Sequence, residues 1–269
     1  MKLLLKEDEK MIHKTMEYSK YVLNGRIVDI QYTVKKQTFK EFPSFDDLIL
    51  FNNSVERKTQ LLLEKKITKR VKKHELKKLF SFIIARCDVC GKIRVFYVSS
   101  KYGTEEYINF REHVTCYHCR MSNRLRLMAT ILKQTLRKND NIYIQERITD
   151  FYDWLATNYN NVTGSEYLEG YRSGQMADVP NMNLPYQVRH EDCLDYSFDD
   201  NTFDVIISQD VFEHVSNAEK AFFEAYRILN KNGKMIFTVP VMYNNDQTIQ
   251  RAYLENGGGK KYITTGLSW

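Results

Sequence analysis

The sequence has no long run of apolar residues. Its longest largely apolar stretch, residues 79–85, is far shorter than the roughly 20 residues that a transmembrane helix needs, and it predicts a buried core segment. The opening residues, MKLLLK, are too short for a secretory signal. Because both features are missing, we expect a cytosolic (cytoplasmic) protein, in which thiols stay reduced and paired cysteines hold metal more often than they form disulfides.

Cysteine is scarce, with five residues in the chain, yet four of them form two C-x-x-C pairs. Four thiolates at such spacing suit tetrahedral zinc, and a closed four-cysteine site predicts a structural metal. Gly91, directly after the first pair, fits the tight turn around sulfur. Unrelated free thiols, a redox pair and His118 as a replacement ligand are the less favoured alternatives, since no βαβ context surrounds either pair and His118 is expected to face outward. The expected ligands are Cys87, Cys90, Cys116 and Cys119.

Composition indicates a globular protein, because 43% hydrophobic and 13% aromatic residues can form a core. The length allows one large domain or two modest ones. The net charge of +6 is unevenly divided: residues 1–137 are basic and residues 138–269 are acidic. This break falls just before residue 141, where a series of strand patterns begins.

The first 80 residues carry weaker signals. They predict a short helix, a turn at Asn24 and Gly25 and a strand pair, followed by helical spacing that continues with a shift of phase through residues 76–83. Many lysines lie between these apolar positions. They could neutralise the phosphates of a nucleic acid, but a solvated helix face is the favoured interpretation because only one aromatic residue, Phe80, lies nearby.

Residues 187–241 give the strongest structural pattern. Residues 203–208 predict a strand that is buried on both faces, and residues 234–239 predict another. Between them, Ser216 and Glu219 form a capping-box pattern, apolar residues fall on one helical face, and Gly233 is expected to end the helix. Strand, helix and strand thus predict a right-handed βαβ unit.

Further elements are expected upstream. Residues 141–146 predict a first strand, 148–159 a helix and 161–168 a second strand, after an amphipathic helix over 121–136. Acidic residues stand at the ends of these strands. Because open α/β sheets bind ligands outside the carboxyl ends of their strands, we expect a binding site there.

The run HEDCLDYSFDDNTFDVIISQDVFEHVSNAEKAFFEAYRILNKNGKMIFTVP resembles class I S-adenosylmethionine-dependent methyltransferases of the type 11 branch, with similarity over about residues 138–245. This resemblance implies an α/β fold with a Rossmann-like, mostly parallel sheet. The expected divisions are a mixed helical, lysine-rich region of unknown role (1–84), a small zinc ribbon (85–121) and a methyltransferase-like domain (122–269).

The resemblance also implies a binding site for S-adenosyl-L-methionine. Glu166 matches the acid that accepts hydrogen bonds from the ribose, and Asp192 the acid that accepts from the adenine amino group, with Cys193 beside it. Asp210 would lie under the methyl donor. The family has a glycine-rich loop after the first strand, whereas this chain has QERITD, so Glu146 becomes a candidate for the methionine end; an ordinary surface glutamate is an equal alternative.

The resemblance implies methyl transfer to an oxygen or nitrogen of a small molecule or glycan. His214 is a candidate general base for a hydroxyl acceptor, although a structural hydrogen-bonding role is favoured. The alternative is an inactive regulatory module that holds a partner through its ribbon and basic helix. The chain also looks shortened after residue 241, which predicts an uncovered edge at the fifth strand and self-association or marginal stability.

Overall fold

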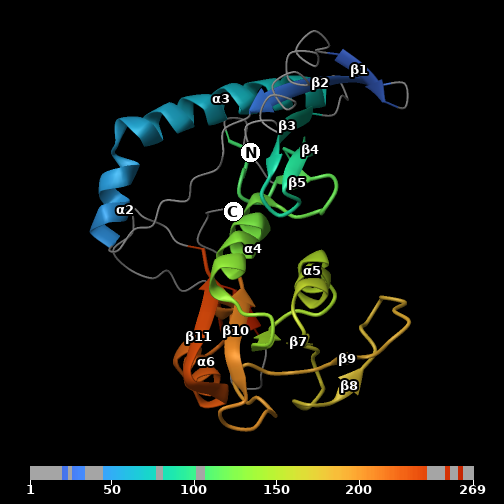
Figure 1. The fold of residues 1–269 in the computed structure, drawn as a ribbon, viewed down its shortest axis with the longest axis vertical. Coiled ribbons are helices and arrows are strands. Elements are labelled where there is room, and N and C mark those ends of the chain that lie inside the picture. Colours follow the sequence, from blue (N-terminus) through green and yellow to red (C-terminus); the bar gives the residue numbers. More distant parts are fainter. Residues whose placement is uncertain are drawn as a thin grey trace. The chain divides into compact units, whose positions relative to one another are not determined.

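A computed structural model describes residues 20–23, 26–33, 45–76, 81–100, 107–240, 252–254 and 260–262. The chain forms two compact units, Met1–Lys133 and Gln134–Trp269 (Figure 1). Each has its own sheet and its own buried cluster. In the described part of the chain, no helix combines the length and apolar character required to cross a bilayer.

The first unit contains a five-stranded sheet in the order β1-β2-β3-β4-β5. Its strands are β1 (Lys20–Leu23), β2 (Arg26–Thr33), β3 (Ser81–Cys87), β4 (Lys92–Val98) and β5 (Val114–Cys116). β2 and β3 are parallel and the other neighbours antiparallel. The strand pair expected on either side of residues 24 and 25 is confirmed, and the short helix expected before it lies outside the described residues.

Two helices, α2 (Phe45–Asn52) and α3 (Val55–Leu76), precede β3. Ile67 and Val71 of α3 are buried in one cluster with Ile83 and Phe96 of the sheet. The helical phase expected to continue through residue 83 is wrong, because β3 begins at Ser81 and buries alternate residues there. Cross-strand pairing with β4 thus overrides a helical spacing that rested on few residues.

The helix α4 (Asn123–Thr135) follows β5, within the amphipathic helix expected over residues 121–136. The boundary expected after residue 84 falls inside β3. Strands β3, β4 and β5 share one sheet with β1 and β2, so the cysteine pairs belong to a sheet that is larger than a separate ribbon. The boundary between the compact units falls after Lys133, near the end of α4.

The second unit is built on a parallel sheet in the order β11-β10-β6-β7. The strands are β6 (Asn141–Ile144), β7 (Asn161–Gly164), β10 (Phe203–Gln209) and β11 (Leu229–Thr238). A parallel bridge between Glu166 and His190 places the segment of β9 (Val188–Arg189) beside β7. Numbered along the chain, the strands therefore lie in the order 3-2-1-4-5, which confirms the expected Rossmann-like parallel sheet.

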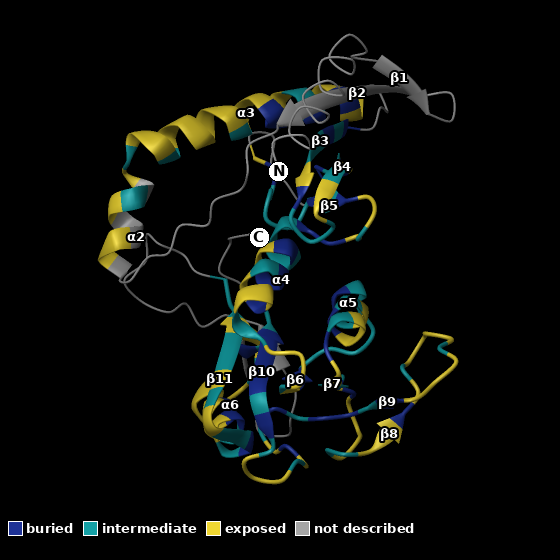
Figure 2. Cartoon of the chain, in the orientation of Figure 1, coloured by how far each residue is buried: buried dark blue, intermediate teal, exposed yellow. Residues whose placement is uncertain are grey.

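The sheet is buried on both faces. Tyr143 and Ile206 pack with Ala221 and Ala225 of α6 (Ala218–Ile228), and by strand alternation Ile144 points to the opposite face. α5 (Asp150–Asn158) contacts β7 and has its own buried residues. Figure 2 shows β10 as largely buried, so its continuous apolar sequence follows from cover on both faces.

The capping and stop signals around α6 need correction. Asn217, not Ser216, is the N-cap, because its side chain accepts a hydrogen bond from Lys220 N at 3.0 Å. The helix ends at Ile228, before Gly233. Gly233 instead lies in β11, where the pairing register shifts and a Cβ atom would lie 2.8 Å from Asn230 O. Glycine is therefore required at this position because the strand is irregular and crowded there, and not because a helix ends.

Four short elements complete the described part of the second unit. β8 (Met176–Ala177) pairs with β9 within an otherwise irregular segment, and η1 (Phe212–His214) is a single 3₁₀ turn. β12 (Ala252–Leu254) and β13 (Lys260–Tyr262) form an antiparallel pair. The other residues after 240 lie outside the described residues, so the expected uncovered edge stays a prediction.

Candidate functional site

Four acidic residues follow four strands of the parallel sheet at their carboxyl ends. Glu146 follows β6, Glu166 follows β7, Asp192 follows the β9 segment and Asp210 follows β10. Because the strands are parallel, these ends share one edge of the sheet. The order along the sheet reverses between β6 and β10, which is where open α/β sheets form a ligand crevice.

Glu146 lies at this reversal point. Its Oε1 accepts a hydrogen bond of 2.6 Å from Gln209 Nε2. The bond joins the carboxyl ends of the first and fourth strands, and Glu146 is half-buried. The side chain is therefore fixed at the sheet edge, unlike a solvated surface glutamate.

Glu166 closes the loop that follows β6. Its Oε1 accepts hydrogen bonds from the backbone N–H groups of Arg147 at 2.7 Å and Ile148 at 3.0 Å. Within the described residues, no hydrogen bond ends on Oε2. A carboxylate thus satisfies the loop amides, while its second oxygen remains able to accept from a ligand.

Gly164 allows this loop to lie close to β7. A Cβ atom at this position would come within 2.5 Å of the Tyr152 ring and 2.6 Å of Glu146 O. The backbone carbonyl cannot move without shifting the loop. Gly164 is therefore required for the close packing of this loop and of Tyr152 against β7.

Arg147 joins the loop to two aromatic rings. Its guanidinium carbon lies 4.3 Å from the centre of the Tyr152 ring and 4.6 Å from that of Tyr186. Tyr186 belongs to the long segment between β7 and β9. The stacking thus holds that segment against the loop after β6.

Asp192 is held in a turn. Its Oδ1 accepts a hydrogen bond from Leu194 N at 2.9 Å, and its own N–H donates to Ser173 Oγ at 3.0 Å. Cys193 beside it is buried, and burial raises the pKa of its thiol to about 11. Cys193 is therefore a neutral packing residue at neutral pH, and Asp192 offers the acceptor.

Tyr167, the residue after Glu166, was missed by the sequence interpretation. Its side chain is 65% exposed, and the charge of Asp192 is near enough to contribute, after burial, to a raised pKa of the phenol. An exposed aromatic ring next to Glu166, and near the charge of Asp192, offers a flat apolar surface. The signal in the sequence was its position directly after the acid that ends a strand.

Asp210 adopts an unusual backbone conformation, with φ of 52°. Its N–H donates to Thr238 O at 3.0 Å, and its Oδ1 accepts from Thr238 Oγ1 at 2.9 Å. A left-handed conformation at a residue other than glycine costs about 1 kcal/mol, and these bonds to β11 hold it. The carboxylate is thereby turned out of the strand direction at the sheet edge.

His214 is not held by the other candidate residues. It lies in η1 with a side chain that is 74% exposed, and Nε2 is 3.9 Å from Glu213 Oε1. Its backbone N–H donates to Val211 O. The described structure therefore places this imidazole at the surface, with only a neighbouring glutamate beside it.

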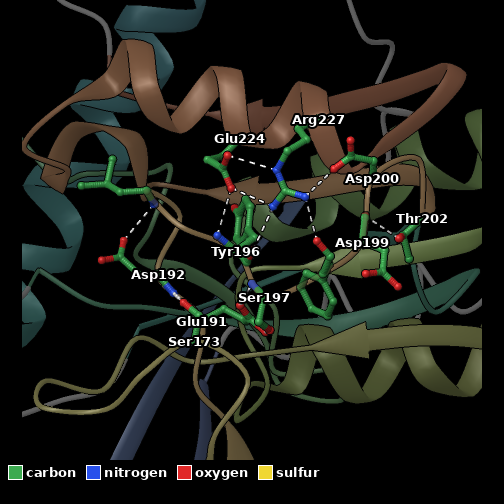
Figure 3. Close-up of polar contacts among 12 residues, drawn as sticks. Ser173, Glu191, Asp192, Tyr196, Ser197, Asp199, Asp200, Thr202, Glu224 and Arg227 are labelled. Atoms are coloured by element: carbon green, nitrogen blue, oxygen red, sulfur yellow. Dashed lines mark hydrogen bonds and ion pairs between the residues drawn. The ribbon is translucent and has the colours of Figure 1, made fainter.

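A polar network behind the acids was also missed by the sequence interpretation. Tyr143 and Ser165 share a buried hydrogen bond of 2.7 Å between their hydroxyl groups, and Gln145 Nε2 donates to the Tyr196 hydroxyl. Arg227 of α6 donates to Tyr196 O at 2.9 Å (Figure 3). Tyrosine in an apolar pattern gives no sign of its hydroxyl partner, so tertiary pairing of this kind has no local signal.

The four paired cysteines of the first unit come together. Their Sγ atoms all lie within 4.8 Å of one another, and those of Cys87 and Cys119 are 3.8 Å apart. Four sulfurs held tetrahedrally at about 2.3 Å from one zinc are roughly 3.8 Å apart, so the cluster has the size that zinc requires. His118 is exposed and lies outside this cluster, as expected.

Both cysteine turns have the same backbone. Gly91 and Arg120 follow their pairs with φ of 68° and 57°, and each N–H donates to the carbonyl of the first cysteine at 2.8 Å. The thiols differ in acidity: neighbouring thiols lower the pKa of Cys87, whereas burial and the charge of Cys87 raise that of Cys90 to about 11. Together they can hold four negative charges only with a cation present.

The second unit has a parallel sheet in the order 3-2-1-4-5 with acidic residues at the carboxyl ends of its strands, which is a Rossmann-like arrangement with a candidate ligand site at that edge. Residues 149–237 match the family of the type 11 methyltransferase domain. The match begins at α5 and ends within β11.

Three known proteins are similar to parts of the chain. Phosphoethanolamine N-methyltransferase 2 of Caenorhabditis elegans is 40% identical over 48 residues, which are 18% of this chain and 11% of that protein. A structure named as a methyltransferase of Bacillus halodurans C-125 is 18% identical, with 45% and 53% of the two chains covered and a TM-score of 0.35. A structure named as a sarcosine dimethylglycine methyltransferase of Galdieria sulphuraria is 19% identical, covering 43% and 45%, with a TM-score of 0.31. These structural likenesses are weak, and the fold assignment rests on the strand order.

Proposed function

We propose that the second unit binds S-adenosyl-L-methionine at the carboxyl edge of its sheet and transfers a methyl group to an oxygen or nitrogen of a small molecule or glycan. The observation that carries this proposal is the set of acids that follows neighbouring parallel strands. Bound S-adenosylmethionine supplies a sulfonium methyl group, which leaves a neutral thioether when an acceptor lone pair displaces it.

The acids have distinct proposed roles. Glu166 accepts from the ribose hydroxyls through Oε2, since Oε1 is engaged by the loop amides. Asp192 accepts from the adenine amino group, and Cys193 packs beneath it. Glu146, fixed by Gln209, accepts from the ammonium group at the methionine end. Asp210 adds negative charge where the cationic sulfonium would lie.

The acceptor chemistry limits what the chain has to provide. The leaving thioether needs no proton, so holding the reactants in line contributes most of the rate, and a base matters only when the acceptor must lose a proton. The nematode relative is named for methylation of a nitrogen in phosphoethanolamine, which supports a small-molecule acceptor. His214 is surface-exposed and would act only on an acceptor that covers it.

We also propose that Cys87, Cys90, Cys116 and Cys119 bind one structural zinc ion. The sulfur spacing supports it, and four protein ligands leave no open position for catalysis. A role as a regulatory binding module is the second candidate. It is favoured by one observation, namely that the two loop amides after β6 are already bonded to Glu166.

Calorimetry with S-adenosylhomocysteine tests the proposal through Glu166→Gln and Asp192→Ala. The glutamine keeps an oxygen for the loop amides but replaces the second acceptor with a donor, so we expect binding to weaken by about 1–3 kcal/mol; Asp192→Ala should cost a similar amount. Asp153→Ala, an exposed change on α5, serves as control.

Unchanged affinity in both site variants would contradict the proposed roles. If the unaltered protein binds neither S-adenosylmethionine nor its demethylated product at millimolar concentration, the regulatory candidate replaces the enzyme. If the unaltered protein does bind, methyl transfer from labelled cofactor to extract metabolites tests the acceptor class.

A further inference from the structure

Arg227 of α6 uses all of its N–H donors within the second unit. Nε and Nη2 donate to the two carboxylate oxygens of Glu224 at 3.1 and 2.9 Å, and Nη1 donates to Asp200 Oδ1 at 2.8 Å. The remaining bonds go to the carbonyl oxygens of Tyr196 at 2.9 Å and Phe198 at 2.8 Å. Figure 3 shows the guanidinium between α6 and the segment that follows Asp192.

Glu224 completes the hold on Tyr196. Its Oε2 accepts from Tyr196 N at 3.1 Å, so both backbone polar groups of Tyr196 are bonded to the Glu224 and Arg227 pair. The Glu224 side chain is 12% exposed and that of Arg227 is 25% exposed, so water screens this pair only partly. Asp200 is 68% exposed and contributes less.

Tyr196 connects the pair to the sheet edge. Its side chain is buried, its ring packs edge-on against Tyr143, and its hydroxyl accepts from Gln145, the residue before Glu146. Toward the N-terminus, only three residues separate Tyr196 from Asp192, and the turn between them is closed by the bond from Asp195 N to Asp192 O. The helix is thus connected to Asp192 through a short segment that is closed by hydrogen bonds at both of its ends.

We infer that Arg227, with Glu224, is a positioning residue for the recognition of the adenine base by Asp192. Neither side chain needs to touch the ligand. The inference rests on the proposed binding of S-adenosylmethionine and adds a residue that determines specificity for the base. A lysine cannot replace Arg227, since a single ammonium group lacks the planar fork that reaches two carbonyls and a carboxylate together.

The test compares two ligands. S-adenosylhomocysteine carries the adenine amino group, whereas S-inosylhomocysteine carries a carbonyl oxygen at that position, which cannot donate to Asp192. For Arg227→Lys we expect about a tenfold loss of affinity for the first ligand and a change of less than about twofold for the second. A general loosening of the fold would weaken both ligands equally. Arg137→Lys, outside this network, is the matched control and should leave both affinities unchanged.

Glu224→Gln provides a second variant that preserves shape, with an expected loss of about threefold confined to S-adenosylhomocysteine. Equal losses for the two ligands, or no loss for either, would overturn the positioning role while the proposed function stands. If the unaltered protein binds neither ligand, the proposed function and this inference fail together.

Discussion

At the residue scale, Asp204 joins three strands at the amino edge of the second sheet. Its Oδ2 accepts from Asn141 N of β6 at 2.8 Å, and its Oδ1 accepts from Asn230 Nδ2 of β11 at 2.9 Å. The hydrogen bond from Asn141, followed by that from Asn230, lowers the pKa of this carboxyl. The ionised form is therefore bound more favourably in the folded state than in the unfolded state.

We expect Asp204→Ala to lower the free energy of unfolding by about 2 kcal/mol at pH 7, since two hydrogen bonds to a charged group are lost. A lowered folded pKa gives stability that is present above the unfolded pKa of about 4 and is lost as pH falls through the folded pKa. The difference between wild type and variant should therefore shrink toward pH 3. Trp154 of α5 lies in the second unit, so its fluorescence during urea unfolding reports on that unit.

Asp199→Ala is the control for this prediction, because Asp199 is an exposed acid near the same strand. A difference between wild type and Asp204→Ala that stays constant from pH 7 to pH 3 would show that the charge of Asp204 does not contribute.

The positions of the candidate residues could be predicted from sequence where the signal is local, while their roles stay predictions. Acids at strand ends and cysteines in pairs carry their signal in type and spacing. Arg227 did not, because an arginine near a helix end is expected in solvent and three of its partners, Tyr196, Phe198 and Asp200, come from a segment about 30 residues away. The partners of Glu166 were equally hidden, since a backbone amide leaves no trace in side-chain composition.

At the element scale, the two cysteine turns share a geometry with different residues. Gly91 and Arg120 both have positive φ, and a Cβ atom at Gly91 would meet nothing within 4 Å. Gly91→Ala should therefore cost only backbone strain, about 1 kcal/mol, and weaken zinc retention roughly fivefold in competition with a chelator. Gly170→Ala is the matched control, because Gly170 has φ of 88° and equally open surroundings outside the first unit.

Zinc retention that falls equally in both variants, or in neither, would count against a coupling between this turn and the metal. The prediction is independent of methyl transfer, since it is measured on the metal alone.

Helices and strands were predictable where the spacing of apolar residues and the length of the segment both indicated the same type of element. β10 and α6 were correctly expected, because a continuous apolar run and a helical face leave little choice. Their ends were not: Asn217 and Ser216 are both good caps, and only the packing of α6 decides between them. The residues at 81–83 fit a helix by spacing. Their pairing with β4 depends on residues that lie further along the chain than a local pattern of spacing covers.

At the scale of the whole molecule, the proposed zinc ion and the proposed cofactor belong to different compact units. We expect about one zinc per chain, and its removal by a chelator should abolish hydrogen-exchange protection in β3 to β5 while β6 and β10 keep theirs. Restored zinc should restore the protection. Simultaneous loss of protection in both sheets, or no loss in either, would refute this division.

The strand order has a consequence for biosynthesis. β6 is made first in its unit, yet it lies at the centre of the sheet between β7 and β10. On a ribosome adding about 5–20 residues per second, β10 emerges several seconds after β6. During that interval one edge of β6, with Ile142 and Ile144 that end fully buried, has no partner strand. The central strand of the mature fold thus waits for its second partner during synthesis, and slower translation of residues 165–205 would prolong its exposure to chaperones and to aggregation.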